Sequence, residues 1–192
     1  MTIMIIGLLI FLGSHSVRIF AENWRQQQIT KLGETNWKLA YSAVSILGLA
    51  IAIYGFGQMR FDPIYIWFPP SGLRHAVALL MVPAFIMLVA AYVPRNAIKA
   101  KLGHPMMLSV KIWALAHLLA NGRLGDIIFF AAFLVWAILA FKTAKKRDRL
   151  SPPAPVSTSK MSTIATVVIG LGAYVVFAFY LHPVLIGVPV FG

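Results

Sequence analysis

The chain has 192 residues, of which 60% are hydrophobic and only 11% are charged. Soluble domains carry roughly 25% charged residues, so this composition excludes an ordinary soluble protein and indicates a membrane protein. The formal net charge is +12, but the basic residues separate apolar runs, which favours membrane topology over nucleic-acid binding. Because the chain contains no cysteine, it has no disulfide, no thiolate metal site and no cysteine nucleophile.

Six apolar segments are predicted to form membrane-spanning helices, since a helix needs about 20 apolar residues to cross about 30 Å of hydrocarbon. The first lacks the features of a cleaved signal peptide and is interpreted as a retained helix. The fourth and fifth are short, so a five-helix alternative with one re-entrant segment stays open. In chain order the segments are residues 2–20, 36–57, 73–93, 105–120, 126–141 and 161–181. The predicted fold is an all-α, polytopic membrane helical bundle.

Basic residues are distributed unevenly among the predicted loops. Thirteen of the 17 lie in the first, third and fifth loops, whereas the second and fourth contain only Arg60, Arg74 and Arg123. Lys111 falls inside the fourth span. By the positive-inside rule the odd-numbered loops are cytoplasmic, which places the protein in a bacterial inner membrane with both termini periplasmic.

Residues 1–192 are predicted to form a single transmembrane domain. The basic and proline-rich segment 142–160, which precedes the last span, predicts a cytoplasmic linker that contacts anionic lipid. The sequence shows no internal repeat, phosphate-binding loop or dinucleotide-binding motif. We therefore expect any function to reside inside the helical bundle.

Two of the five histidines are predicted to lie near the middle of the membrane. His15 lies roughly 18 to 20 Å below the periplasmic start of the first span, and His117 lies about 18 Å above the cytoplasmic start of the fourth. Their depths differ by about 6 Å, which helix tilt absorbs. His75, His104 and His182 lie at helix ends. An ionisable side chain inside a membrane is costly, so the two deeper histidines are the candidate functional residues.

Two imidazoles that meet in a cysteine-free bundle predict bis-axial ligation of a b-type haem. No carboxylate accompanies them at the same depth, which argues against zinc or a di-iron centre. Gly13 and Ala114 leave space for the macrocycle, Trp113 is placed to pack against it, and Arg18 to pair with a propionate. In the alternative interpretation, the imidazoles only hydrogen-bond neighbouring helices and Arg18 extends to the cytoplasmic interface.

Two sequence elements carry a family resemblance. One is Gly-Ser-His-Ser-x-Arg at residues 13–18, and the other is Leu-Gly-His-Pro-Met-Met at 102–107 followed by Lys-Ile-Trp-Ala-Leu-Ala-His-Leu-Leu-Ala-Asn-Gly at 111–122. Over most of the chain to about Phe141, the sequence resembles the NnrU family of bacterial membrane proteins. The resemblance implies a link to nitrate, nitrite and nitric oxide respiration. It also implies a relation to 15-cis-zeta-carotene isomerase, a haem b membrane enzyme.

The resemblance to the isomerase places its haem ligands at His15 and His117, the same two histidines that depth selects. Where the isomerase has a cysteine three positions before its second histidine, this sequence has Ala114. Two functions stay open: an enzyme whose haem isomerises or reduces a small apolar substrate, and a non-enzymatic haem- or nitric-oxide-binding accessory protein for denitrification complexes. A third alternative is an isoprenylcysteine-methyltransferase-like enzyme, because His104-Pro105 resembles the Arg-His-Pro element of those enzymes. The resemblance is weaker, since Gly103 stands where those enzymes have the arginine.

Overall fold

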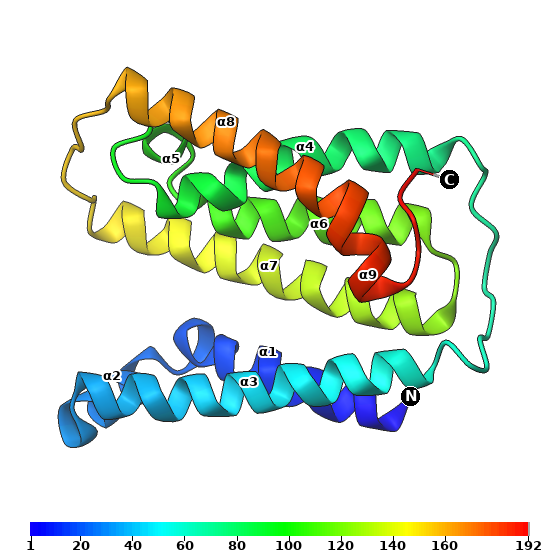
Figure 1. Ribbon diagram of the computed structural model, residues 1–192. Helices are drawn as coiled ribbons and strands as arrows, with labels where there is room; N and C mark the ends of the chain where they lie inside the picture. Colours follow the sequence, from blue (N-terminus) through cyan, green and yellow to red (C-terminus); the bar gives the residue numbers. More distant parts are fainter. Residues whose placement is uncertain (192) are drawn as a thin grey trace.

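The computed structural model describes residues 1–191, which form an all-α bundle (Figure 1). The first part is an antiparallel pair of long helices connected by a short one. The second part contains four longer helices and three short helical elements. In chain order the elements are α1 (Thr2–Phe20), α2 (Glu22–Leu32), α3 (Glu34–Gln58), α4 (Leu73–Tyr92), α5 (Ala97–Leu102), α6 (Pro105–Ala120), α7 (Leu124–Leu150), α8 (Lys160–Val176), the π-helical turn η1 (Phe177–Leu181) and α9 (His182–Ile186).

The long helices confirm the prediction of an all-α membrane bundle. Within the described residues, α1, α3, α4, α7 and the continuous stretch Lys160–Ile186 are each long and apolar enough to cross a membrane. The fourth predicted span, α6, is apolar but has only 16 residues, which gives a length of about 24 Å. It packs between α4 and α7, so its neighbours cover much of its surface.

Helix α7 is longer than the sequence predicts. The predicted span ends at Phe141 and the predicted linker begins at Lys142, yet the helix continues through the basic run to Leu150. Lysine, arginine and alanine are good helix formers, and basic residues in a last turn interact favourably with the helix dipole. Ser151-Pro152-Pro153 then ends the helix because proline cannot continue it. Only residues 151–159 of the predicted linker are non-helical.

Helices α1 and α3 pack with their backbones in close contact. A Cβ atom added to Gly7 would lie 2.2 Å from the backbone nitrogen of Ala52, and one added to Gly55 would lie 2.3 Å from that of Met4. Small residues allow this approach in membrane bundles, where van der Waals packing drives helix association. Fully buried Met4 and Ala52 connect this helix pair to the core, which also contains the Phe129, Phe130 and Phe133 side chains of α7.

The loop between α3 and α4 docks on the turn between α6 and α7. The backbone N–H of Ile66 donates to the Gly122 carbonyl at 2.8 Å, and that of Leu124 donates to the Ile64 carbonyl at 2.8 Å. A Cβ on Gly122 would lie 1.8 Å from the carbonyl oxygen of Trp67, so only glycine fits here. This docking fixes the loop against the start of α7.

The start of α1 and the short helix α9 lie at the same end of the bundle (Figure 1). Met1 lines a cavity together with Arg60 and Arg123, and Arg60 donates a hydrogen bond to the carbonyl oxygen of Ile186 in α9. We call this the terminal end. Helices α2 and α5 and the basic last turns of α7 lie at the opposite end (Figure 1), which we call the basic end.

Candidate functional site

His15 lies on α1 with its ring among aromatic side chains. Its Nδ1 atom is 2.8 Å from the carbonyl oxygen of Phe11, one turn earlier. The ring centroid is 4.3 Å from that of Phe11, 5.3 Å from that of Tyr41 on α3 and 5.8 Å from that of Trp136 on α7. The imidazole is therefore held at the junction of α1, α3 and α7.

His117 lies on α6 in a similar local arrangement. Its Nδ1 atom is 2.8 Å from the carbonyl oxygen of Trp113, one turn earlier. Its ring centroid is 4.6 Å from that of Phe130 and 5.4 Å from that of Trp113. The backbone carbonyl of His117 accepts a hydrogen bond from Asn121 Nδ2 at 2.8 Å, which closes the last turn of α6.

The two imidazoles make the same kind of contact with the backbone. In each case Nδ1 faces the carbonyl oxygen of an aromatic residue four positions earlier. A carbonyl only accepts hydrogen bonds, so this contact favours the tautomer that carries the proton on Nδ1. The Nε2 atom then keeps its lone pair, which is the arrangement found in histidines that bind metals.

The structure does not bring the two imidazoles together. Their contacts on α7, Trp136 for His15 and Phe130 for His117, are six residues apart. Six residues correspond to about 9 Å along a helix and to faces about 120° apart. Within the described residues, no Cα atom of α1 approaches one of α6 within 8 Å. The two rings thus contact α7 on different turns and on different faces, and α7 contacts both α1 and α6.

A chain of aromatic contacts connects the two histidines instead. The Phe11 ring is 5.8 Å from that of Phe133, and Phe133 is 5.3 Å from Trp113 between ring centroids. Phe11 and Trp113 are the residues whose carbonyls face the imidazoles. The aromatic cluster thus fills the centre of the bundle between the two histidines.

The other predicted site residues have different surroundings. Trp113 packs in the aromatic cluster, and Ala114 is fully buried in the core. Gly13 is exposed and lines an apolar groove of about 360 Å³ between α1 and α7. Arg18 is exposed in the last turn of α1, toward the basic end. Of these residues, Gly13 lines the apolar groove, whereas Trp113 and Ala114 belong to the packed core.

The histidines at helix ends make local structural contacts. His104 Nε2 lies 2.9 Å from Asp148 Oδ2, so it connects the start of α6 to the end of α7. His182 Nδ1 lies 2.6 Å from the carbonyl oxygen of Val188. His104 is the residue on which the weaker methyltransferase resemblance depends, and its observed contact is with a neighbouring helix.

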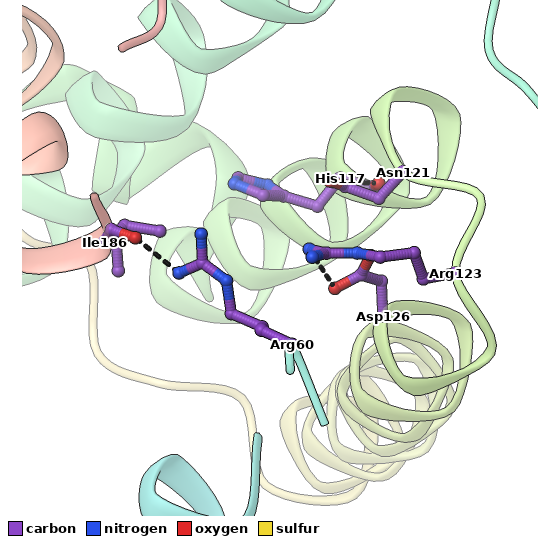
Figure 2. Close-up of polar contacts among 6 residues, drawn as sticks. All are labelled: Arg60, His117, Asn121, Arg123, Asp126 and Ile186. Carbon is purple, nitrogen blue, oxygen red and sulfur yellow. Dashed lines mark hydrogen bonds and ion pairs between the residues drawn. The ribbon is translucent and has the colours of Figure 1, made fainter. Parts of the chain in front are cut away.

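A polar cluster at the terminal end was not predicted from the sequence. Arg123 forms a two-point ion pair with Asp126, at 2.6 Å and 3.0 Å, and the Asp126 side chain is only 3% exposed. Figure 2 shows Arg123 against Asp126 and Arg60 directed toward Ile186. The sequence gives one hint. The predicted second and fourth loops contain few basic residues, and Arg60 and Arg123 lie there although the positive-inside rule does not require them.

Comparisons with known proteins identify one family. No curated protein and no solved structure matches the chain. The family model described as NnrU protein matches residues 3–190, which include α1, α6 and the last membrane-spanning stretch. The match thus extends well beyond the two motifs around His15 and His117. The chain belongs to the NnrU family.

Proposed function

We propose that this NnrU-family chain is a membrane protein that binds haem b through His15 and His117. The observation that supports this proposal is the shared contact of Nδ1 with the carbonyl oxygen one turn earlier, at 2.8 Å in both cases. The contact orients each ring and leaves its Nε2 atom available as a ligand.

The donor chemistry fits a haem better than a metal ion held by protein alone. Within the described residues, no group of three or more histidine, aspartate or glutamate side chains is placed to hold a metal ion. A structural zinc site takes four protein ligands, whereas a porphyrin supplies the equatorial nitrogens and needs only axial ones. Bound haem supplies an iron centre for electron transfer or for binding a small gas molecule.

Ligation of one haem by both imidazoles requires the aromatic cluster to rearrange. Phe11, Phe133 and Trp113 pack in the region between the two histidines. Rotation of these side chains is needed to make room for a macrocycle there. The proposal therefore includes a change in side-chain packing on haem binding, and the His15 and His117 variants below test the two ligands separately.

Among the functions open to a haem protein of this family, we favour a haem- or nitric-oxide-binding accessory role in nitrate, nitrite and nitric oxide respiration. Ala114 is fully buried in the core, at the position of the isomerase cysteine. The methyl group of Ala114 has no atom that binds iron, so this position does not support catalysis by exchange of an iron ligand. The alternative is catalysis by the haem on a small apolar substrate.

The test is the optical spectrum of the full-length protein, purified in detergent from haem-replete cells. We expect a Soret band in the wild-type protein. His15→Ala and His117→Ala are each expected to lose most bound haem or to become five-coordinate, because each removes one axial ligand. His75→Ala and His182→Ala are matched controls at helix ends and are expected to keep the wild-type spectrum.

Two results would overturn the proposal: no haem in the wild-type protein, or unchanged six-coordinate haem in both ligand variants. Addition of nitric oxide to the reduced protein distinguishes the roles. A shifted spectrum supports gas binding, whereas a six-coordinate spectrum that nitric oxide does not change contradicts it and supports electron transfer.

A further inference from the structure

Two lysines from different helices lie over one aromatic ring at the basic end of the bundle. Lys111 is on α6, and Lys145 is on α7. Their Nζ atoms are 4.0 Å and 5.8 Å, respectively, from the centroid of the Phe141 ring. An ammonium group within about 6 Å of a ring centroid is attracted by the negative face of the ring. The Phe141 ring therefore brings two positive charges close together.

Neither ammonium group is paired with a carboxylate. Among residues 1–191, no ion pair joins Lys111 or Lys145 to an acidic side chain. The Asp148 carboxylate on the same helix is 2.9 Å from His104 Nε2. A Cβ atom added to Gly103 would lie 3.1 Å from Lys145 Nζ and 3.6 Å from Asp148 Oδ2, so these two groups flank the turn before α6 without pairing directly. Two ammonium groups repel each other, and a bound anion would compensate this repulsion.

The position of Phe141 places the two lysines at a membrane boundary. Phe141 is the last residue of the predicted fifth span, and the exposed Lys142 follows it. Lys111 lies about 9 Å from the start of α6, and a helical side chain points back toward the N-terminus of its own helix. Its ammonium group thus extends toward the basic end, as a lysine does when it leaves hydrocarbon. Lipid phosphate groups lie at this level.

We propose that Lys111 and Lys145 together bind the phosphate group of an anionic phospholipid, an inference that does not depend on haem binding. A phosphate accepts charge-assisted hydrogen bonds from both ammonium groups. The boundary position favours a lipid over a free phosphate ion, because lipid phosphates are already concentrated there. The sequence predicts lipid contact only for segment 142–160, whereas this site also uses Lys111 of α6.

The test measures which lipid the purified protein retains. Full-length protein is delipidated in detergent and titrated with phosphatidylglycerol, which is anionic, or with phosphatidylcholine, whose choline group offsets the phosphate charge. Native mass spectrometry counts the lipid molecules that are bound. We expect the wild-type protein to bind its first phosphatidylglycerol molecule about tenfold or more tightly than phosphatidylcholine, because two lysines act on one anionic headgroup.

The variants test each lysine against a matched control. Lys111→Gln and Lys145→Gln are each expected to reduce the preference about fivefold, the contribution of one lysine near anionic lipid. Lys146→Gln removes the same charge from an exposed side chain of α7 and is expected to keep nearly all of the preference. Lys111→Arg keeps the positive charge and is expected to keep the preference, which separates lost charge from altered folding.

Three results would contradict this site. Equal binding of the two lipids would mean that the lysine pair does not recognise an anionic headgroup. An equal loss in Lys146→Gln and Lys111→Gln would indicate general attraction to a basic surface. Displacement of phosphatidylglycerol by excess inorganic phosphate, at constant ionic strength, would identify free phosphate as the ligand. Because no readout uses the Soret band, failure here leaves the haem proposal unaffected.

Discussion

At the scale of single residues, the recurring feature is an imidazole whose Nδ1 faces the carbonyl oxygen four residues earlier. A net hydrogen bond contributes only about 1 kcal/mol, so its main effect here is on orientation. The i−4 residue is aromatic in both cases, and its ring also lies against the imidazole, at 4.3 Å for Phe11 and 5.4 Å for Trp113 between centroids. Backbone and ring contacts together limit the orientations that His15 and His117 adopt.

His104 is expected to be structural. His104→Gln is predicted to retain haem, because His104 Nε2 contacts Asp148 on α7 and an amide nitrogen is able to donate to the same carboxylate. The free energy of unfolding is expected to fall by no more than about 1 to 1.5 kcal/mol. The Soret band and thermal unfolding in detergent measure the two effects. A folded His104→Gln protein without a Soret band would show that His104 is a haem ligand.

Gly122 is expected to tolerate no side chain. In Gly122→Ala the new Cβ would overlap the Trp67 carbonyl oxygen, at 1.8 Å, and a backbone atom does not move aside as a flexible side chain does. Overpacking of this kind costs about 1 to 3 kcal/mol, so the melting temperature is expected to fall. Gly57→Ala is the control, because nothing lies within 4 Å of its Cβ position. Equal melting temperatures for the two variants would contradict the docked loop.

At the scale of helices, α1 and α3 depend on small residues for their contact. The hydroxyl oxygens of Ser14 and Ser45 are also 3.2 Å apart across this interface. Because His15 lies on α1 and Tyr41 beside it lies on α3, the packing of these two helices determines the surroundings of His15.

Substitutions on α1 are expected to separate interface glycines from exposed ones. Gly7→Ala places its Cβ 2.2 Å from the Ala52 nitrogen, whereas Gly13→Ala meets nothing within 4 Å. Gly7→Ala is expected to lower the free energy of unfolding by about 1 to 3 kcal/mol. Gly13→Ala is expected to leave it unchanged or raise it, since alanine is the better helix former. Detergent unfolding that ranks the two variants in the opposite order would refute this interface.

At the scale of the whole molecule, the basic segments gather at one end of the bundle, as the distribution of charge in the sequence predicts. The chain begins and reaches α9 at the terminal end, and α2, α5 and the last turns of α7 lie at the basic end (Figure 1). Of the six apolar helical stretches of residues 1–191 that run between these two ends, five are long and apolar enough to span a membrane, and α6 is shorter. We propose that the terminal end is periplasmic, because basic loops are retained in the cytoplasm.

Reporter fusions test this orientation. An alkaline phosphatase fusion after Gly192 is expected to be active, and a fusion within residues 151–159 is expected to be inactive, because the enzyme folds only outside the cytoplasm. A green fluorescent protein fusion at the same two sites serves as the control, with the opposite pattern expected. The reverse pattern for both reporters would mean that the basic end faces the periplasm.

The sequence by itself determined the class of fold and most of its helices. Apolar runs about 20 residues long require helices in a membrane, because hydrocarbon offers no other partner for backbone polar groups. Each of the six predicted spans is helical. The predicted end of the fifth span does not coincide with the end of α7. Charged residues mark where a helix leaves the membrane, but the helix itself is able to continue beyond that point. Residues 142–150 continue as a helix.

The tertiary structure alone decided which residues meet. Depth arguments placed His15 and His117 within reach of each other, yet helix rotation and the position of α7 place them against different faces of that helix. The pairing of His104 with Asp148 and the shared cavity of Arg60 and Arg123 join residues far apart in the sequence. Such contacts depend on how helices rotate and pack around one another. Hydropathy and charge determine how deep a residue lies, but not the direction in which its side chain points.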